Sequence, residues 1–295
     1  MPSSGVSAGE LVPANRTAAT TRPDQIKHLR QTILNLAVCG KLVVQDPKDE
    51  PASELLRRIA KEKARLLSLG EIRRDKIPSA ISIDDEPFSL PVLWRWCRLR
   101  SLASALGDGL HGTPNYVTGT ECYFINGNNL DNGLIVIKPT TKTVAAEEVK
   151  KHKKPLNQHS VLVSINGTLG KVAFYDGQHI VLGKSACYFN LTEFTNKWFA
   201  KLVLDSPYFT NYAGNNATGT TIMNLSLNAM NEFPFPLPPL AEQHRIVAKV
   251  DALMALCDRL EAGLTTTAAT RRRLLDALLA EALAPAGART LAAAE

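Results

Sequence analysis

The 295-residue chain has few cysteines, and none is placed as a disulfide framework or a zinc site requires. The five are widely separated and no two form a C-x-x-C pair: Cys39, Cys97, Cys122, Cys187 and Cys257. The six histidines also show no metal-ligand spacing. We therefore expect neither a disulfide scaffold nor a bound metal.

Motifs for several kinds of catalysis are missing as well. There is no N-P-P-Y methyltransferase motif, no glycine-rich cofactor loop and no serine nucleophile elbow. The segment 177–185, GQHIVLGKS, partly matches a phosphate-binding loop, but five residues separate Gly177 from Gly183 where that motif has four. Its apolar IVL also predicts a strand, which cannot cradle phosphates. The sequence therefore predicts a protein without catalysis of its own.

Long apolar runs are absent too. No run approaches the roughly 20 residues of a membrane span, and residues 1–22 lack the charged start and apolar core of a signal peptide. We expect a cytoplasmic protein. The 34 basic and 28 acidic residues give a net charge of +6, which allows a polyanion such as nucleic acid as a partner.

Proline and glycine positions divide the chain into a disordered tail at 1–23, a helical segment at 24–90, a β-rich domain at 91–238 and a long helical region at 239–295. In the β-rich domain, short runs such as LIVIK, VLVSI, KVAFY and CYFNL are broken by Gly and Asn. A helical stretch near Asn196 to Leu204 interrupts them. The expected fold class is α+β, with a β-rich domain flanked by long amphipathic helices.

Two helices are predicted before the β-rich domain. The first begins at Asp24, ends at Gly40 and carries one apolar stripe: Ile26, Leu29, Ile33, Leu36 and Ala37. The second begins at Ser53 and ends at Gly70. Its RRIAKEKAR face fits a solvated surface better than direct DNA contact, although both interpretations remain open.

The terminal helix follows a proline-rich strap. Pro238 and Pro239 stand at its start, and Glu242 in its first turn faces the positive end of the helix dipole. Apolar residues then recur at heptad spacing, as a helix-pairing seam: Ile246, Val250, Leu253, Cys257, Leu260 and Leu264. Three threonines at 265–267 predict a soft break, after which Leu274 and Leu278 resume the register. We expect a partner helix to cover this stripe, which no other part of the chain covers.

Several segments together resemble one known family. PLPPLAEQHRIVAKVD at the strap closely resembles the proline-to-helix junction of specificity (S) subunits of type I restriction-modification systems. HLRQTILNLAVCGKLVVQD and the following DEPASELLRRI resemble the segment that leads from a conserved helix into a recognition domain. Between them, GLHGTPNY, YFINGNNL, SINGTLGKVAFY, LGKSACYFN and ATGTTIMNLSLNAMNEFPFPLPPL resemble, in order, segments of one class of target recognition domain. A full S subunit has two recognition domains, so this chain resembles half of one.

The resemblance implies a non-catalytic subunit that reads a half-site of double-stranded DNA. It implies a partner methyltransferase (M) subunit, which uses S-adenosylmethionine, and a restriction (R) subunit that uses ATP and Mg; no cofactor is expected on this chain. It also implies a homodimer or pairing with another half-subunit. Two alternatives remain open: a self-contained DNA-modifying or DNA-cleaving enzyme with unrecognised catalytic residues, and a β-rich ligand-binding domain dimerised by its helices.

The loops of the β-rich domain supply the candidate DNA-binding residues. Asn can pair with adenine in the major groove, and Thr offers a methyl and a hydroxyl, although Asn and Gly also suit tight turns. Lys171 and Lys184 each follow a glycine that lets the backbone approach a phosphate. The candidates are His111, Thr113, Asn115, Tyr116, Asn126, Asn128, Asn129, Asn166, Thr168, Lys171, Lys184, Ser185, Thr218 and Thr220.

A second basic feature is the run VKKHKK at 149–154. Four lysines surround His152 there. A solvated patch and a phosphate clamp account for this run equally well.

Overall fold

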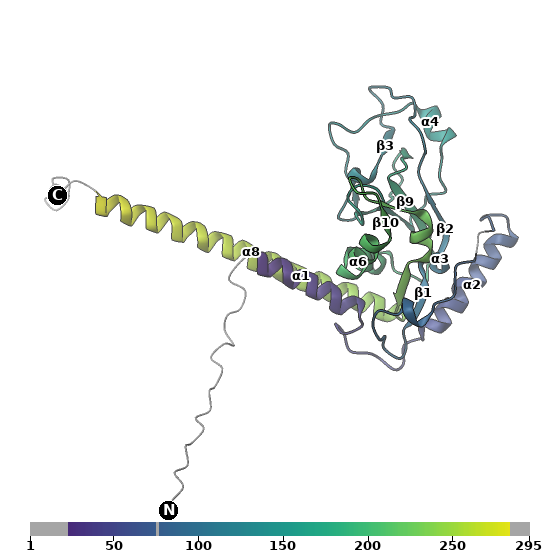
Figure 1. Cartoon of the computed structure of the whole chain (residues 1–295), viewed down its shortest axis with the longest axis horizontal. Helices are drawn as coiled ribbons and strands as arrows, with labels where there is room; N and C mark the ends of the chain where they lie inside the picture. The colour runs from purple at the N-terminus through teal and green to yellow at the C-terminus, as the bar shows by residue number, and fades with distance from the viewer. Residues whose placement is uncertain (1–22, 75–76, 284–295) are drawn as a thin grey trace, which may run out of the picture. The chain divides into compact units, whose positions relative to one another are not determined.

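The computed structural model of the chain describes residues 23–74 and 77–283 and has the expected α+β composition (Figure 1). Its contacts form two units, residues 31–253 and residues 23–30 with 254–283. Of the predicted tail at 1–23, residues 1–22 lie outside the described part, as do residues 284–295, and Pro23 begins the first helix. Within that part, no helix combines the length and apolarity needed to cross a membrane.

The elements follow one another in an order that encloses the β-rich domain between helices. The helices are α1 (Pro23–Val38), α2 (Ala52–Ser68), α3 (Leu99–Leu102), α4 (Ala146–Lys151), α5 (Lys197–Asp205), α6 (Pro207–Asn216), α7 (Leu227–Glu232) and α8 (Leu240–Leu283), with 3-10 turns η1 (Ile83–Asp85) and η2 (Gly127–Asn129). The strands are β1 (Arg95–Arg98), β2 (Ala103–Asp108), β3 (Tyr123–Ile125), β4 (Leu130–Asp131), β5 (Leu134–Ile135), β6 (Ser160–Ser164), β7 (Val172–Phe174), β8 (Ile180–Leu182), β9 (Ala186–Leu191), β10 (Ala217–Thr218), β11 (Asn224–Leu225) and β12 (Pro234–Leu237).

The centre of the domain is an antiparallel sheet in the order β2-β9-β6-β7. Strands β6 and β9 are buried along their whole length, which explains why their sequences are continuous apolar runs without alternation. Strands β3 and β8 pair with each other in parallel, with Phe124 opposite Val181. A core cluster joins residues of this parallel pair to residues of the main sheet: Ile125, Leu130, Leu162, Ala173, Ile180, Leu182, Ala186 and Tyr188.

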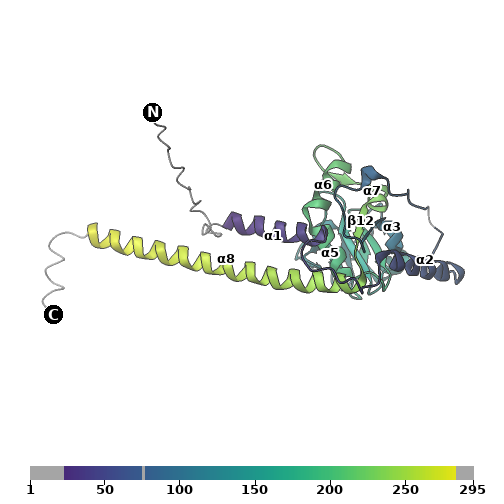
Figure 2. The same cartoon turned by 90° about the horizontal axis from the view of Figure 1, so that it is seen from below.

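A second hydrophobic region surrounds the antiparallel pair β1–β12, at the end of the domain away from β3 and α4 (Figure 1). Helices α5, α6 and α7 gather around β12 (Figure 2). Phe233 is fully buried and makes an edge contact with Phe209 at 5.0 Å between ring centroids, and Phe199 contacts Phe235 at 6.0 Å. This packing explains why FPFPL forms a buried strand. Strand β12 pairs only with β1 among the described strands, so the N–H groups that prolines 234 and 236 lack are not needed to bond a further strand.

Arg98 on β1 fixes an irregular segment to this region. Its guanidinium donates two hydrogen bonds to Asp85, at 3.0 and 2.6 Å, and others to the carbonyl oxygens of Ala80 and Glu232. The hydrogen bond from Arg98 is the main reason why the pKa of Asp85 lies below its usual value. The Arg98 side chain is 8% exposed, so its guanidinium is a largely buried charge, and the hydrogen bonds to these acceptors stabilise it.

The first two helices end where glycine predicts. Gly40 has φ +68°, and a Cβ there would lie 2.4 Å from Cγ of Pro91, so both its conformation and its space require glycine. Helix α2 begins at Ala52, one residue before the expected start, and Gly70 follows its end with φ +71°. These boundaries agree with the predictions to within one or two residues.

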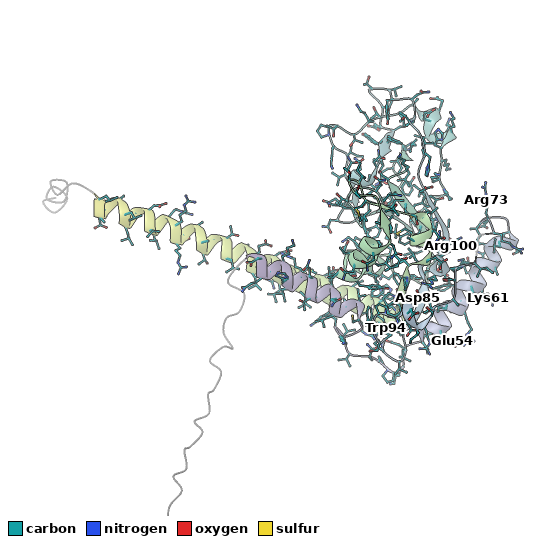
Figure 3. The ribbon with its side chains drawn as sticks, in the orientation of Figure 1. Glu54, Lys61, Arg73, Asp85, Trp94 and Arg100 are labelled. Carbon is teal, nitrogen blue, oxygen red and sulfur yellow. The ribbon has the colours of Figure 1, made fainter. Side chains whose placement is uncertain are left out.

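The charged face of α2 is occupied by contacts within the chain. Arg65 pairs with Glu62 at 2.8 Å, Arg57 pairs with Glu54, and Arg58 lies over the Phe194 ring at 4.3 Å. Glu54 and Lys61 lie along this helix in Figure 3, where Asp85, Trp94 and Arg100 lie toward β1. The pairs fit the solvated-surface interpretation of RRIAKEKAR better than direct DNA contact.

Helix α8 starts at two buried polar side chains, Glu242 and Gln243, which together with their hydrogen-bond partners we call the joint. Glu242 and Gln243 are both 0% exposed in its first turn. The Glu242 carboxylate accepts hydrogen bonds from Trp94 Nε1 at 2.9 Å and Gln45 Nε2 at 2.6 Å. Gln243 accepts from the backbone N–H of Asn196 at 2.8 Å and donates to the Pro238 carbonyl. The AEQHR segment therefore ties the helix start to three separated parts of the domain.

The predicted break at the three threonines is wrong, because α8 runs without interruption to Leu283. The hydroxyls of Thr265, Thr266 and Thr267 donate to the carbonyl oxygens four residues earlier. These bonds satisfy the hydroxyls inside the helix, so the threonines do not compete with its backbone ladder.

The predicted seam is covered only in part, and part of the cover comes from this chain. Arg30 of α1 donates to Asp258 at 2.8 Å and to Glu261 at 2.7 Å, and Ile26 and Cys257 are buried in the same unit. The expectation that no other segment covers the stripe is therefore wrong at Cys257. Ile246 and Val250 are also buried, Leu253 and Leu264 are half-buried, and Leu260 is exposed.

Candidate nucleic-acid interface

The carboxyl ends of the parallel strands β3 and β8 bring three loops together. The Gly183 N–H donates to the Ile125 carbonyl at 2.8 Å, the Leu110 N–H donates to the Leu182 carbonyl at 2.6 Å, and the Lys184 N–H donates to the Leu110 carbonyl at 3.1 Å. Loop 109–116, turn 126–129 and loop 183–185 therefore lie next to one another. They come from positions far apart in the sequence, and a parallel pair is what places their ends on one edge.

Glycines allow this close approach. A Cβ on Gly109 would lie 2.3 Å from the Gly183 carbonyl oxygen, and one on Gly183 would lie 2.3 Å from Asn126 Oδ1. Ser185 completes the contact, because its hydroxyl donates to Asn126 Oδ1 and accepts from the Gly127 N–H, both at 2.9 Å. The candidate residues Asn126 and Ser185 thus contact each other directly.

Two further loops extend this edge. The Ile165 N–H donates to the Ser185 carbonyl at 3.0 Å, and the Leu225 N–H donates to the Ile165 carbonyl at 2.8 Å. Asn166 Nδ2 approaches Asn224 Oδ1 at 3.3 Å. These contacts place loop 165–171 and the hairpin 217–225 beside loop 183–185. We call the whole set the reading edge: loops 109–116, 126–129, 165–171, 183–185 and 217–225.

Most of the predicted residues on the reading edge have side chains open to solvent. The exposed ones are His111, Thr113, Asn115, Tyr116, Asn128, Thr168, Lys171, Lys184, Thr218 and Thr220, and the half-buried ones are Asn126, Asn166 and Ser185. The exposed Asn and Thr side chains on these loops offer donors and acceptors of the kind that base edges in the major groove require.

Asn129 does not fit the base-reading role that we predicted for it. It is 4% exposed, and its side chain accepts from the Asn126 N–H and donates to the Val136 carbonyl and to Thr141 Oγ1. All three bonds shape the turn. The alternative role, a turn residue, accounts for Asn129.

The charges at the reading edge are unequal. Lys171 Nζ lies 2.5 Å from Asp131, and this hydrogen bond is the main reason why the pKa of that carboxyl is lowered. His111 Nε2 lies 2.5 Å from Asp108. Lys184 forms no ion pair with any residue that the structure describes. Of the two candidate lysines, Lys184 is thus the less neutralised.

Two residues that contact candidate residues of the reading edge were not predicted. Lys138 Nζ donates to the Asn128 carbonyl at 2.5 Å, and Asn224 contacts Asn166. Asn224 lies within ATGTTIMNLSLN, so the same Asn-rich pattern could have identified it. Lys138 carried no local signal, because its position depends on the pairing of β4 with β5.

No group of three or more His, Cys, Asp or Glu side chains within residues 23–74 and 77–283 is arranged to hold a metal ion. Every cysteine is a free thiol. Burial raises the pKa of the thiols at Cys97 and Cys187, which keeps them protonated and unreactive.

Residues 114–268, which include most of the reading edge and the joint, match the type I restriction modification DNA specificity domain. The chain belongs to this family. It is 31% identical over 265 residues to the type I restriction enzyme EcoAI specificity subunit of Escherichia coli, with 88% of this chain and 45% of that subunit covered. It is 28% identical over 273 residues to the EcoEI specificity subunit of the same organism, with 89% and 46% covered.

The chain thus spans about half the length of the curated relatives it matches. A solved chain from work on complex assembly and conformational transition of the type I R-M system superimposes with a TM-score of 0.50. That match is 19% identical and covers 88% of this chain and 57% of the other. It supports the α+β fold described above.

Proposed function

We propose that this chain is the part of a type I specificity subunit that reads one half-site of double-stranded DNA, and that it has no catalysis of its own. The observation that supports this most strongly is the reading edge. Five loops from distant parts of the sequence are joined there by backbone hydrogen bonds, and these loops carry exposed Asn, Thr, His and Lys side chains.

The side chains of the reading edge differ in whether they suit bases or phosphates. Asn128 is exposed and free to pair with a base edge, and the Thr218 and Thr220 side chains carry methyl groups that suit thymine. Lys184 and Lys138 supply positive charge for phosphates, which position DNA without specifying its sequence. Rigid glycine-dependent loops keep these groups in fixed relation, as discrimination between bases requires.

The partners in this proposal are a methyltransferase (M) subunit and a restriction (R) subunit. S-adenosylmethionine belongs to the first, and ATP with Mg to the second. Helix α8 is the proposed docking and pairing element, because Leu274 and Leu278 are 61% and 63% exposed among the described residues. A second copy of this chain or another half-subunit would provide the second reading edge, and the complex would act in the cytoplasm.

The proposal is tested with the full chain, purified alone and together with its methyltransferase. We expect the chain alone to bind duplex DNA and to show neither cleavage with Mg nor methyl transfer from S-adenosylmethionine. Methyl transfer should appear only when the methyltransferase is added. Turnover by the chain alone would instead support a self-contained enzyme, and indifference to DNA would support a ligand-binding domain.

A further inference from the structure

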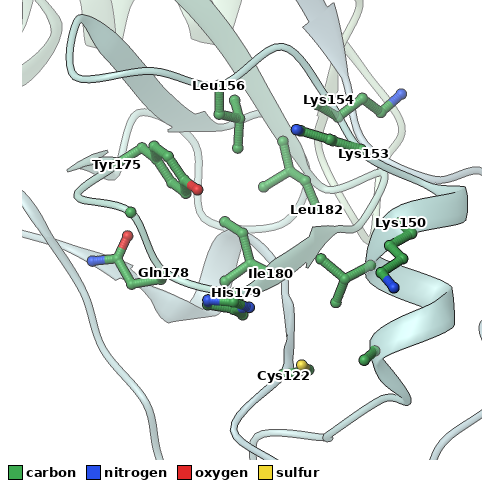
Figure 4. A pocket seen from close by; sticks show the side chains of 13 residues that line it. Cys122, Lys150, Lys153, Lys154, Leu156, Tyr175, Gln178, His179, Ile180 and Leu182 are labelled. Atoms are coloured by element: carbon green, nitrogen blue, oxygen red, sulfur yellow. The ribbon is translucent and has the colours of Figure 1, made fainter.

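The basic run at 149–154 borders a pocket on the same domain. The pocket has a volume of about 390 Å³ and is formed by α4, the loop that follows it and the segment 175–182 (Figure 4). Its lining residues are Cys122, Ala146, Val149, Lys150, Lys153, Lys154, Leu156, Tyr175, Gly177, Gln178, His179, Ile180 and Leu182. Three lysines therefore line one concavity, and no Asp or Glu of residues 23–74 and 77–283 is among its lining residues.

The charges of these lysines are not neutralised inside the chain. Glu148 lies 3.8 Å from Lys151 and 3.4 Å from His152, so the one buried carboxylate of α4 interacts with those two groups. Lys150, Lys153 and Lys154 have no ion pair within residues 23–74 and 77–283. Lys153 extends over the pocket, whereas Lys154 turns away from it (Figure 4). Lys150 and Lys153 are thus the principal cations of the pocket.

The floor of the pocket strengthens its attraction for anions. Val149, Leu156, Ile180 and Leu182 form an apolar surface beneath the lysines, and the Tyr175 hydroxyl points inward (Figure 4). Attraction between opposite charges increases where water is displaced by apolar groups. A single phosphate group with two non-bridging oxygens suits two ammonium donors and a hydroxyl.

The position of the pocket relates it to the reading edge. The segments that contain β3 and β8 pass the pocket at their start, at Cys122 and Ile180, and reach the reading edge directly after the strands end, at Asn126 and Gly183. Four Cα-to-Cα steps separate Ile180 from Lys184, which span at most about 13 Å at about 3.3 Å per residue. The major groove of B-DNA is about 12 Å wide. A duplex whose bases meet the reading edge can therefore bring a backbone phosphate to the pocket.

We propose that this pocket binds a phosphate ester, namely a backbone phosphodiester of the duplex next to the half-site, held mainly by Lys150 and Lys153. This inference rests on the proposed DNA-reading function. A free nucleotide offers the same phosphate chemistry, so the experiment has to distinguish the two sources.

The test compares the full chain with the Lys150→Gln/Lys153→Gln double variant on a random-sequence 30-bp duplex, by anisotropy at several salt concentrations. Loss of one phosphate contact lowers the magnitude of the slope of log K against log salt by about 0.9, and both lysines hold the same phosphate, so we expect a reduction of about 0.9. Lys150→Arg/Lys153→Arg should retain the slope. Lys48→Gln/Lys61→Gln, which removes the same charge at two other exposed positions, should leave it unchanged.

An unchanged slope in the first double variant, or an equal loss in the Lys48/Lys61 control, would overturn the assignment. Calorimetric titration with AMP supplies the second arm. Heat of AMP binding that disappears in Lys150→Gln/Lys153→Gln, together with an unchanged DNA slope, would assign the pocket to a free nucleotide and also overturn the proposal. Failure of the unaltered chain to bind any duplex would contradict the DNA-reading function itself.

Discussion

Trp94 donates its indole N–H to a carboxylate oxygen of Glu242 at 2.9 Å, and both side chains are almost completely buried. This bond joins the residue that precedes β1 to the first turn of α8. Arg245, one turn further along α8, adds an ion pair with Asp49 at 2.5 Å. The start of the long helix is therefore held to the recognition domain by specific polar contacts, which the apolar heptad pattern alone does not provide.

Trp94→Phe should destabilise the fold more than the same change at Trp96. The Trp94 variant leaves the buried Glu242 carboxylate with one donor fewer, which costs about 1.5 to 3 kcal/mol for a bond to a charged group. Trp96 Nε1 is buried and has no hydrogen-bond partner within residues 23–74 and 77–283, so Trp96→Phe loses packing but no such bond. Urea denaturation of the two variants measures the difference. Equal losses would mean that the Trp94–Glu242 bond does not stabilise the joint.

Glu242 and Asp85 should give opposite pH dependences. Burial raises the pKa of Glu242 despite its two donors, so its contribution to stability is present below its unfolded pKa and is lost as pH rises through the folded value. The pKa of Asp85 is lowered by the hydrogen bond from Arg98, so its contribution is present above the unfolded value and is lost as pH falls through the folded one.

The free energy of unfolding, measured from pH 3 to 7 for the unaltered chain, Glu242→Gln and Asp85→Asn, tests both signs. Relative to Glu242→Gln, the unaltered chain should lose stability as pH rises above about 4. Relative to Asp85→Asn, it should instead lose stability as pH falls below about 4. Parallel curves for all three proteins would show that neither carboxyl is perturbed as described.

Asn128 and Asn129 are adjacent in sequence and should behave differently. Asn129→Ala removes three hydrogen bonds of the turn and should cost about 1 to 3 kcal/mol of stability. Asn128→Ala removes an exposed side chain and should change stability by less than about 0.5 kcal/mol. Thermal unfolding of the two variants decides. A destabilised Asn128 variant would assign that residue to the turn as well.

The exposed part of α8 should be needed for assembly and not for folding. Leu274→Lys/Leu278→Lys should leave the unfolding temperature unchanged, because both leucines are largely exposed within this chain. The same variant should lose pairing and methyltransferase capture, since each leucine buried at an interface contributes about 1.5 to 3 kcal/mol. Thr266→Lys/Thr270→Lys, at exposed polar positions of the helix, is the matched control in co-purification. Undiminished capture by the leucine variant would remove this face from the docking role.

Local sequence signals predicted the helices well. Gly40 and Gly70 end the first two helices because only glycine adopts their positive φ readily, and the 3.6-residue periodicity identified α1, α2 and α8. The threonine run at 265–267 was misread as a break because the fate of its hydroxyls depends on carbonyls one turn away. Each of these features is decided within a few residues of sequence.

The reading edge was predicted in composition but not in arrangement. Leu110 contacts Leu182, and Asn126 contacts Ser185, across separations of more than 50 residues that no local period encodes. The burial of Asn129 and the joint at Glu242 depend on the same kind of distant contact. The residue types that suit base reading also suit turns, so only the packed fold separates Asn128 from Asn129.

Genome-wide mapping of methylated adenines, in cells that carry this chain and its methyltransferase, tests whether the reading edge recognises DNA. A symmetric pair of reading edges reads one half-site twice in opposite orientations, so the account predicts an interrupted palindrome. Asn128→Ala should relax one base at the equivalent position of both halves and leave the rest of the motif unchanged. A non-palindromic site would show that a different half-subunit is the partner. Absence of any methylated motif that depends on this chain, or a motif that survives alanine at Asn128, Thr218, Thr220 and Lys184 together, would contradict the claim that the reading edge recognises DNA.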